Sequence, residues 1–277
     1  MMMTRKFSIL GSNDTEAITH VALSKSKQYI SVCERCTAGN KGKFSIYDVN
    51  SQKKRKTLPE QIQDINAYDS QEFIASAFSP KDEKMIVTLT GEPDWHVFLW
   101  NWDREKLIAK TSIGHQGNIE RSICNFQISY NPFDQSASTV LVTGPGNTFV
   151  YLKQRKEEQH DTIFTADHSQ INNLEQGRAI STNFTCHNWS QKTGMILICT
   201  DNGEMLLCAN NGEYKSYILE SPLGKPISAV YSFENGFVVC EGKNFIIFKS
   251  EDGDERALLR KDGDSLPIQM REPGHAN

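Results

Sequence analysis

Short apolar runs dominate the hydrophobic pattern of this chain. Segments of about four to eight residues, rich in Val, Ile, Phe and Tyr, alternate with polar stretches of Gly, Asn, Asp, Ser or Pro. No longer stretch keeps the roughly 3.6-residue apolar spacing of an amphipathic helix. Residues 70–78 come nearest, but their β-branched and aromatic content and the Ser79-Pro80 pair that follows them favour a strand. The sequence therefore predicts an all-β protein.

The predicted strands fall into repeated groups of four. Residues 73–109 and residues 184–218 both give a strand, a polar turn, a very apolar strand, a tight turn, a strand, a short turn and a further strand. The turns that follow the first strands lie near Ser24, Ser79, Asn131, Ser190 and Phe233. A four-stranded repeat of roughly 40 to 50 residues is the signature of a β-propeller blade. We predict a WD40-type β-propeller over residues 1–250, with about five four-stranded blades of which the fifth is incomplete, and a polar tail over residues 251–277.

The second strand of each group is apolar on both faces, as in residues 85–89, 195–199 and 237–240. A strand with this pattern lies between two packed sheets, and stacked blades supply that environment. The predicted core residues lie mostly in these inner strands: Phe78, Ile86, Leu89, Phe98, Trp100, Val140, Val142, Phe149, Ile196, Ile198, Leu206, Val238, Ile246 and Phe248.

The pair Trp102-Asp103 raises the question whether one group is a WD repeat. It ends the third predicted strand of its group, and Gly114-His115 precedes the next group. WD repeats carry these dipeptides at these places, although no other group has both pairs. His115 is expected to be structural. Asn202-Gly203 predicts a type I′ hairpin turn, and residues 144–146 (Gly-Pro-Gly) predict a turn, not a phosphate loop, because no helix follows them.

The composition argues against several classes of function. The formal net charge of −4 argues against a dedicated nucleic-acid binder, which would carry a basic surplus. No apolar run is long enough for a signal peptide or a membrane span. Seven scattered cysteines, mostly inside apolar runs, indicate buried reduced thiols. We expect a soluble, intracellular protein that binds neither nucleic acid nor membrane.

Candidate chemistry is sparse. Cys33 and Cys36 form a C-x-x-C pair without the second ligand pair of a zinc site or the strand-to-helix setting of a redox motif, so we expect one buried thiol and one turn thiol. The seven histidines are dispersed, without the spacing of a catalytic triad or a carboxylate pair. A propeller enzyme would need ionisable groups that converge at the inner strands, and the sequence shows none. We therefore expect no catalytic, cofactor-binding or metal-binding residues, and no enzymatic activity.

One basic cluster stands out, formed by Lys53, Lys54, Arg55 and Lys56. Its simplest interpretation is the solvent-facing outer strand of a blade. Its functional interpretations are a nuclear-localisation motif or a contact with an acidic protein surface such as tubulin. These four residues are the best single candidate for a partner-binding site.

Two segments carry a resemblance to a known family. Residues 53–110 combine the basic stretch with an F-I-x-x-A-F-S-P strand and a W-x-W-x-x-x-K strand end. Residues 184–208 are similar to an H-x-W…G-T-D-x-G-x-L unit, and order and spacing agree over about residues 5–220. The chain resembles the family of cilia- and flagella-associated protein 57, also called WD repeat-containing protein 65.

The resemblance implies a non-enzymatic WD-repeat scaffold of the ciliary or flagellar axoneme, in the cytoplasm and cytoskeleton. Such a scaffold supports the assembly or positioning of inner dynein arms on doublet microtubules. The implied partners are inner dynein arm components, doublet-microtubule-associated proteins and tubulin. The family's coiled-coil region has no counterpart here, so dimerisation through it does not carry over. The alternative is a general cytosolic WD40 protein-interaction adaptor of the translation or ubiquitin-ligase type.

Ring closure has two alternatives. Residues 5–12 have the pattern of a lone outer strand, which would complete the last group and close a five-bladed ring. The family resemblance favours an open arc, because the family's propellers have more blades and material is missing at both ends, as in a fragment or a short relative. An open arc would leave the apolar faces near Val21 and Phe245 uncovered, and the chain would self-associate.

Overall fold

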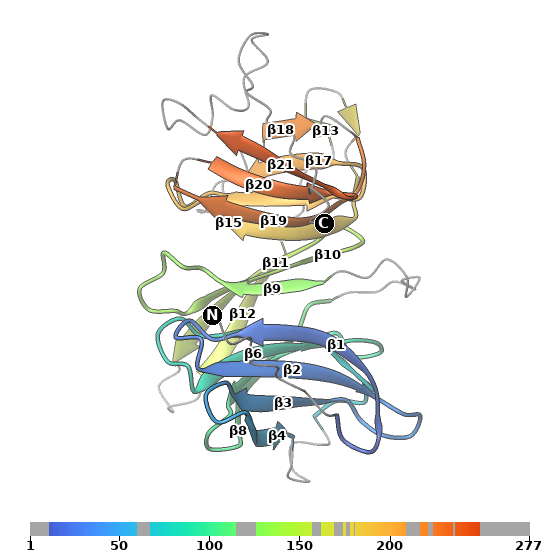
Figure 1. The fold of residues 1–277 in the computed structure, drawn as a ribbon, viewed down its shortest axis with the longest axis vertical. Coiled ribbons are helices and arrows are strands. Elements are labelled where there is room, and N and C mark those ends of the chain that lie inside the picture. The colour runs from blue at the N-terminus through green and yellow to red at the C-terminus, as the bar shows by residue number, and fades with distance from the viewer. Residues whose placement is uncertain are drawn as a thin grey trace, which may run out of the picture. The chain divides into compact units, whose positions relative to one another are not determined.

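A computed structural model describes residues 11–59, 67–114, 126–156, 162–168, 174–175, 178–179, 181–208, 217–220, 224–234 and 236–249 (Figure 1). The regular structure of these residues consists of β-strands, with no α-helix among them. The strands form five sheets and one two-stranded ribbon, and neighbours within each sheet are consecutive in the chain. Four sheets have four strands and the last has three, as the sequence predicts.

The strand bounds are as follows. The first sheet contains β1 (Thr15–Leu23), β2 (Tyr29–Cys36), β3 (Lys43–Asp48) and β4 (Lys53–Leu58). The second contains β5 (Phe73–Phe78), β6 (Met85–Thr90), β7 (His96–Asn101) and β8 (Lys106–Ser112). The third contains β9 (Gln127–Tyr130), β10 (Thr139–Gly144), β11 (Thr148–Lys156) and β12 (Thr162–His168). The fourth contains β15 (Phe184–Trp189), β16 (Ile196–Thr200), β17 (Glu204–Cys208) and β18 (Tyr217–Glu220). The fifth contains β19 (Ile227–Phe233), β20 (Gly236–Glu241) and β21 (Asn244–Lys249), and the ribbon pairs β13 (Leu174–Glu175) with β14 (Arg178–Ala179).

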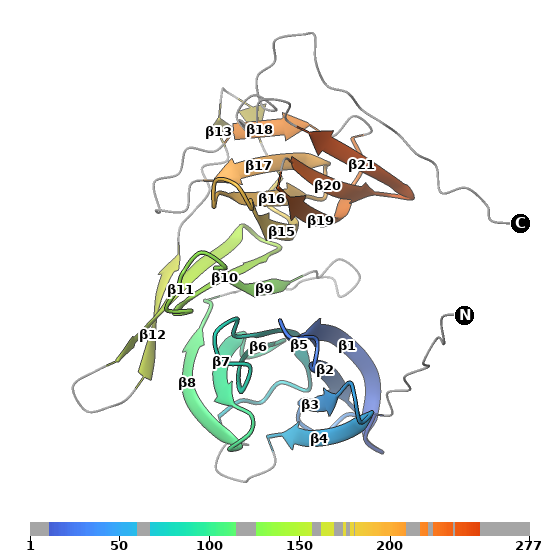
Figure 2. The same ribbon diagram turned by 60° about the vertical axis from the view of Figure 1, so that its left-hand side comes forward.

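The chain divides into two compact units. One comprises Met1–His115, Ile128–Leu141 and Leu152–Ala166, and the other comprises Gln116–Gln127, Val142–Tyr151 and Asp167–Asn277. In the first unit the first and second sheets pack together with β1 beside β5 (Figure 2). In the second unit β15 lies beside β19 in the same way. The third sheet supplies residues to both units.

A buried polar residue follows the first strand in four of the sheets. These residues are Ser24, Ser79, Asn131 and Ser190, the positions where the sequence predicts the turns. In each case the backbone N–H donates to a carbonyl at the start of the second strand, over 2.7–2.9 Å; the pairs are Ser24–Tyr29, Ser79–Met85, Asn131–Thr139 and Ser190–Met195. The side-chain oxygen accepts a second backbone N–H of the same hairpin. The buried polar groups of each turn are thereby satisfied.

The first strand of four sheets carries a β-bulge at the same place. The bulge residues are Thr19, Ile74, Thr185 and Ser228, each of which interrupts the pairing with the second strand. A bulge turns its side chain out of the regular alternation. The Thr19 hydroxyl donates to the carbonyl of Phe73 at the start of β5, and the Thr185 hydroxyl donates to that of Ile227 at the start of β19. Each threonine therefore ties one sheet to the next.

Trp102-Asp103 directly follows β7, which confirms that the pair ends the third strand of its sheet. Val49-Asn50 occupies the same place after β3. The backbone N–H of Trp102 donates to the carbonyl of Lys84 (3.0 Å), as the N–H of Val49 donates to that of Gln28 (2.8 Å). Trp102 is buried, and its indole N–H donates to the Glu83 carbonyl (2.6 Å). The dipeptide thus belongs to a repeated module, and its tryptophan adds a packing contact that the first sheet lacks at this place.

The turn at Asn202-Gly203 differs from the prediction. β16 ends at Thr200 and β17 begins at Glu204, so three residues connect the strands. Gly203 has a φ of 80°, but Asn202 does not have a positive φ, which a type I′ turn requires at both central residues. The loop is a three-residue hairpin with Gly in the left-handed position. The predicted turn at residues 144–146 is confirmed, because residues 145–147 form a turn between β10 and β11.

Two apolar clusters form most of the core between sheets. One joins the first and second sheets, and the other joins the fourth and fifth. All the predicted core residues are buried except Val238, which is half-exposed. In β20, buried Phe237 and Val239 alternate with half-exposed Val238 and Cys240. The prediction that residues 237–240 are covered on both faces is therefore wrong, because one face of the fifth sheet has no covering sheet among the described residues.

The cysteines are mostly buried, as predicted. Cys33 and Cys36 both lie inside β2 and are fully buried. The predicted turn position of Cys36 is wrong because the strand extends far enough to include it. Burial raises the pKa of Cys33 to about 12 and that of Cys36 to about 11. Both remain protonated thiols at neutral pH, which are poor nucleophiles and poor metal ligands.

Some predicted features lie outside the described residues. They are His115, Cys124, residues 5–10 of the N-terminal strand, and the tail over residues 251–277.

His187 is the most deeply buried ionisable side chain of β15. Its Nδ1 lies 2.7 Å from the Thr143 hydroxyl, and its backbone N–H donates to the Gln127 side-chain oxygen (2.7 Å). Burial lowers the pKa of His187 to about 3. The folded protein therefore holds this ring in its neutral form at any pH at which the protein is expected to act.

A core truncation should separate buried from half-exposed positions. We expect Ile86→Ala to lower the free energy of unfolding by roughly 2–5 kcal/mol, because Ile86 is fully buried between the first two sheets. The matched control is Ile18→Ala in β1, where the side chain is 47% exposed and the loss should stay below about 1 kcal/mol. Urea unfolding of both variants measures the difference. Equal losses would contradict the assignment of Ile86 to the core.

Stability in weak acid should depend on His187. The unfolded chain protonates this imidazole below roughly pH 6.5, whereas the folded chain does so only near a pKa of about 3. The stabilising contribution is thus present above roughly pH 6.5 and is lost as the pH falls, by up to about 1.4 kcal/mol per pH unit. Urea unfolding of the wild type and of His187→Gln at about pH 7 and pH 4.5 isolates the effect. Identical pH slopes for the two proteins would refute it.

Candidate partner-binding surface

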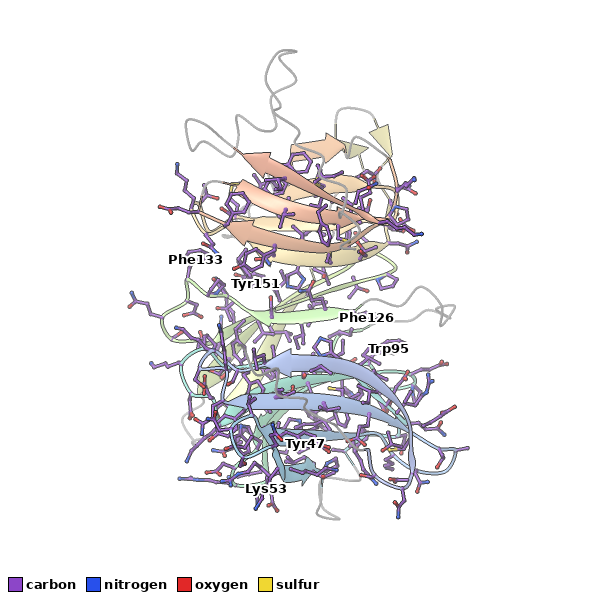
Figure 3. The ribbon with its side chains drawn as sticks, viewed as in Figure 1. Tyr47, Lys53, Trp95, Phe126, Phe133 and Tyr151 are labelled. Carbon is purple, nitrogen blue, oxygen red and sulfur yellow. The ribbon has the colours of Figure 1, made fainter. Side chains whose placement is uncertain are left out.

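The four basic residues lie on β4, the edge strand of the first sheet. The sheet order β1-β2-β3-β4 leaves β4 with a neighbour on one side only. Lys53, Lys54 and Arg55 are exposed and Lys56 is half-buried, and Figure 3 shows Lys53 and Tyr47 on this sheet. The outer-strand position predicted for the cluster is confirmed.

The four side chains have different environments. The Lys54 ammonium lies 5.6 Å from the centre of the Tyr47 ring, which is a cation–π contact across the β3–β4 pair. Lys56 forms an ion pair with Glu105 of the second sheet, and Glu105 is only 18% exposed. Within the described part of the chain, Lys53 and Arg55 make no ion pair. The structure therefore separates two cations committed to contacts within the protein from two that are available to a partner.

Acidic residues of the β7–β8 turn lie close to this edge. Lys84 forms an ion pair with Asp103 (2.9 Å). The hydrogen bond from Lys84, together with the charges of Lys84, Lys56 and Arg55, lowers the pKa of the Asp103 carboxyl. Lys56 and, in part, Arg55 therefore face negative charge from their own unit. Lys53 is the cation of β4 least compensated by its surroundings.

The backbone of β4 disfavours the addition of another strand. Lys54 pairs with Tyr47 and Lys56 pairs with Ile46, so Arg55 forms a β-bulge between them. Bulges and lysines on edge strands are features that prevent pairing with further strands. We therefore interpret the edge as a surface for charge contacts by side chains.

Two contacts at this surface were not predicted from the sequence. Tyr47 supports Lys54, and Glu105 neutralises Lys56. The first contact has a signal in the sequence. The β3–β4 turn has the same length as the turn at residues 102–105, and a turn of this length places Tyr47 opposite Lys54. The second joins residues 49 positions apart in different sheets, and no local pattern reveals it.

No competing site emerges from the chemistry of the described residues. Among them, no group of three His, Cys, Asp or Glu side chains is placed to hold a metal ion. In the same residues there is no helix long and apolar enough to cross a membrane. His20 and His96 lie in different sheets, and burial lowers the pKa of each.

Comparison with solved structures confirms the fold. The β-propeller domain of Cps50 (Swd1) from Myceliophteria thermophila matches this chain with a TM-score of 0.60, over 94% of this chain and 72% of that one. The sequence identity is 11%, so the match concerns the fold alone. The chain is an all-β, WD40-type β-propeller protein. No family model matches its sequence.

Comparison with curated proteins confirms the family resemblance. The chain is 28% identical over 201 residues to cilia- and flagella-associated protein 57 of Mus musculus, and the match spans 71% of this chain and 14% of that protein. It is 24% identical over 293 residues to cilia- and flagella-associated protein 57 C of Tetrahymena thermophila, across 86% of this chain and 21% of that protein. Protein 57 A of the same organism is 24% identical over 189 residues, 67% of this chain and 14% of that protein. The chain therefore spans about a fifth or less of the length of the relatives that it matches.

The ion pair of Lys56 should contribute to stability where Lys53 does not. We expect Glu105→Gln to lower the free energy of unfolding by up to about 1 kcal/mol in low salt, because it removes the ion pair between Glu105 and half-buried Lys56. The loss should shrink in about 1 M NaCl, where charges are screened. Lys53→Gln is the control and should leave stability unchanged. Thermal melts of the three proteins at two salt concentrations measure both effects, and equal behaviour of the two variants would contradict the assignment.

Proposed function

We propose, from the similarity to cilia- and flagella-associated protein 57, that this chain is a non-enzymatic WD-repeat scaffold of the cilium or flagellum. The observation that carries the proposal is that the similarity extends over 67–86% of the chain in three relatives and accompanies a propeller fold. Propeller sheets present loops and outer strands on a rigid frame, which suits protein binding. The absence of a metal cluster among the described residues is compatible with this function but does not carry it.

The specific site of action that we propose is the axoneme, in the cytoplasm and cytoskeleton of the cell. There the scaffold supports the assembly or positioning of inner dynein arms on doublet microtubules. Its partners are inner dynein arm components and proteins associated with the doublets, including tubulin. The support for these partners is the family resemblance of the sequence together with an exposed basic edge on β4.

Location and salt extraction test the proposal. A tagged chain should be found in cilia and should stay with isolated axonemes after a salt wash that removes loosely bound proteins. A chain that is spread through the cytosol and absent from axonemes would overturn the ciliary function. That result would favour a general cytosolic WD40 adaptor of the translation or ubiquitin-ligase type.

We further propose that Lys53 and Arg55 provide the contact with an acidic partner. Both are exposed, and neither forms an ion pair within the described residues, whereas Lys56 is held by Glu105. Charge complementarity at an exposed rim accelerates encounter more than it determines affinity. The contact should therefore be sensitive to salt.

The double variant Lys53→Gln/Arg55→Gln should weaken association with axonemes. We expect a several-fold loss of the bound fraction at low salt and a flatter dependence on salt, because two exposed cations are removed. The control is Lys25→Gln/Lys27→Gln, which removes the same charge from exposed positions of the β1–β2 turn. Co-sedimentation with axonemes across a salt series measures both variants. If the two double variants lose binding equally, net charge and not the β4 edge is responsible.

A further inference from the structure

The packing of the fourth sheet on the fifth follows a simple register. The face of the fourth sheet that is turned to the fifth, its trailing face, has two rows: Cys186, Cys199 and Met205, and Asn188, Leu197 and Leu207. The face of the fifth sheet turned to the fourth, its leading face, contributes Ile227, Phe237, Val239, Ile246 and Phe248. The two sets form one apolar cluster, and the Asn188 side chain donates to the Val230 carbonyl (3.1 Å).

The same register governs the first two sheets. Cys33, Phe44 and Ile46 on the trailing face of the first sheet form one cluster with Phe73, Phe98 and Trp100 on the leading face of the second. Aromatic contacts join them, with Phe44 and Phe73 at 5.3 Å between ring centres. In the second sheet the bulge is at Ile74, and the trailing row that begins with the next residue consists of Ala75, Leu89 and Val97. All three are fully buried. The trailing face is thus buried in the first, second and fourth sheets.

The fifth sheet has the same trailing face, but no sheet of the described residues covers it. Its rows, by register, are Ala229, Cys240 and Phe245, and Tyr231, Val238 and Ile247. They correspond position by position to the two rows of the fourth sheet. Tyr231 is 61% exposed and Phe245 is 55% exposed, and the other four are exposed or half-exposed. None of the six is Lys, Arg, Asp or Glu, so covering these two rows buries no ionised side chain.

The opposite half of this interface is exposed on β1, the first strand of the described residues. Ile18, Val21 and Leu23 share the leading face of β1, because the bulge at Thr19 brings them onto the side of Glu34, Val32 and Ile30. They are 47%, 49% and 52% exposed. Their counterparts in β5 are Phe73, Ser76 and Phe78, which are buried. Val21 and Phe245 are the positions that the open-arc alternative expects to be exposed.

We propose that the trailing face of the fifth sheet binds the leading face of the first sheet in a second copy of this chain. The occupant is argued from the register: a leading face covers a trailing face between the first and second sheets and between the fourth and fifth sheets, and among the described residues each copy presents one exposed example of each face. Apolar patches of this kind on a protein surface mark interaction sites. The association is head-to-tail, so each copy keeps one free face and assemblies larger than a dimer form as concentration rises.

Two single substitutions and their mixture test the proposal. Phe245→Asp alters only the trailing face and Val21→Asp only the leading face, and both positions are exposed enough to accept a charge without unfolding the sheet. In sedimentation velocity, the wild type should grow beyond its 31.3 kDa as concentration rises, whereas each variant alone should associate at least about tenfold more weakly. An equal mixture of the variants should form a complex of two chains and nothing larger, since it retains one intact pair of faces. Lys243→Asp, on the exposed β20–β21 turn, is the charge control and should behave as the wild type.

The alternative outcomes each overturn the proposal. A wild type that stays a single chain at every concentration excludes self-association. Association that survives both substitutions, or that Lys243→Asp also removes, assigns the contact elsewhere. A mixture that remains as single chains shows that the two intact faces do not bind each other, and a single variant that associates like the wild type indicates contact between identical faces. Far-UV circular dichroism confirms that the variants are folded.

Cys240 provides a second measurement that needs no substitution. It lies in the middle of the trailing row and is half-exposed, whereas the other cysteines among the described residues are buried. A maleimide should modify Cys240 in dilute protein and should do so several-fold more slowly at concentrations at which the chain associates. Peptide mass mapping assigns the site. Equal modification rates at both concentrations would overturn the proposal even if the variants failed to fold.

Discussion

Face-to-face packing of one sheet on the next is the interaction on which this structure depends. A sheet of three or four short strands buries too little apolar surface alone to offset the entropy of ordering its backbone. Here the inner strands carry apolar side chains on both faces, and each cluster of the core is shared between two sheets. The sheet is therefore the unit of the sequence repeat, while the pair of sheets is the unit of stability.

The repeat can be predicted from the sequence because it depends on local patterns of apolar and polar residues. A polar residue that ends the first strand, such as Ser24 or Ser79, has a clear chemical role: it closes a turn whose backbone groups would otherwise be buried without partners. The sequence correctly predicts that Trp102-Asp103 ends a strand, because neighbouring residues determine where a strand ends. The two-sided apolar pattern of β6 and β16 likewise predicted strands between packed sheets.

The failures concern information that a local pattern lacks. Val238 is as apolar as the buried valines, and only the absence of a covering sheet among the described residues leaves it half-exposed. The burial of Cys36 depends on β2 continuing to this residue. The type of turn at Gly203 depends on one additional residue in the loop. At the basic edge, the sequence identified the four cations but not the pairing of Lys56 with Glu105 in another sheet, which decides which cations a partner would meet.

The bond that closes each first hairpin also sets how freely the hairpin tips can vary. Ser24 and Tyr29 are five positions apart and Asn131 and Thr139 are eight, yet the same N–H to carbonyl bond joins both pairs. Lengthening a loop on this scale costs less than about 0.6 kcal/mol of closure entropy, so the stability of the sheets changes little. Insertions at the tips are therefore nearly neutral for folding, and these loops can diversify in length and composition under selection for new contacts while the sheets beneath them stay the same.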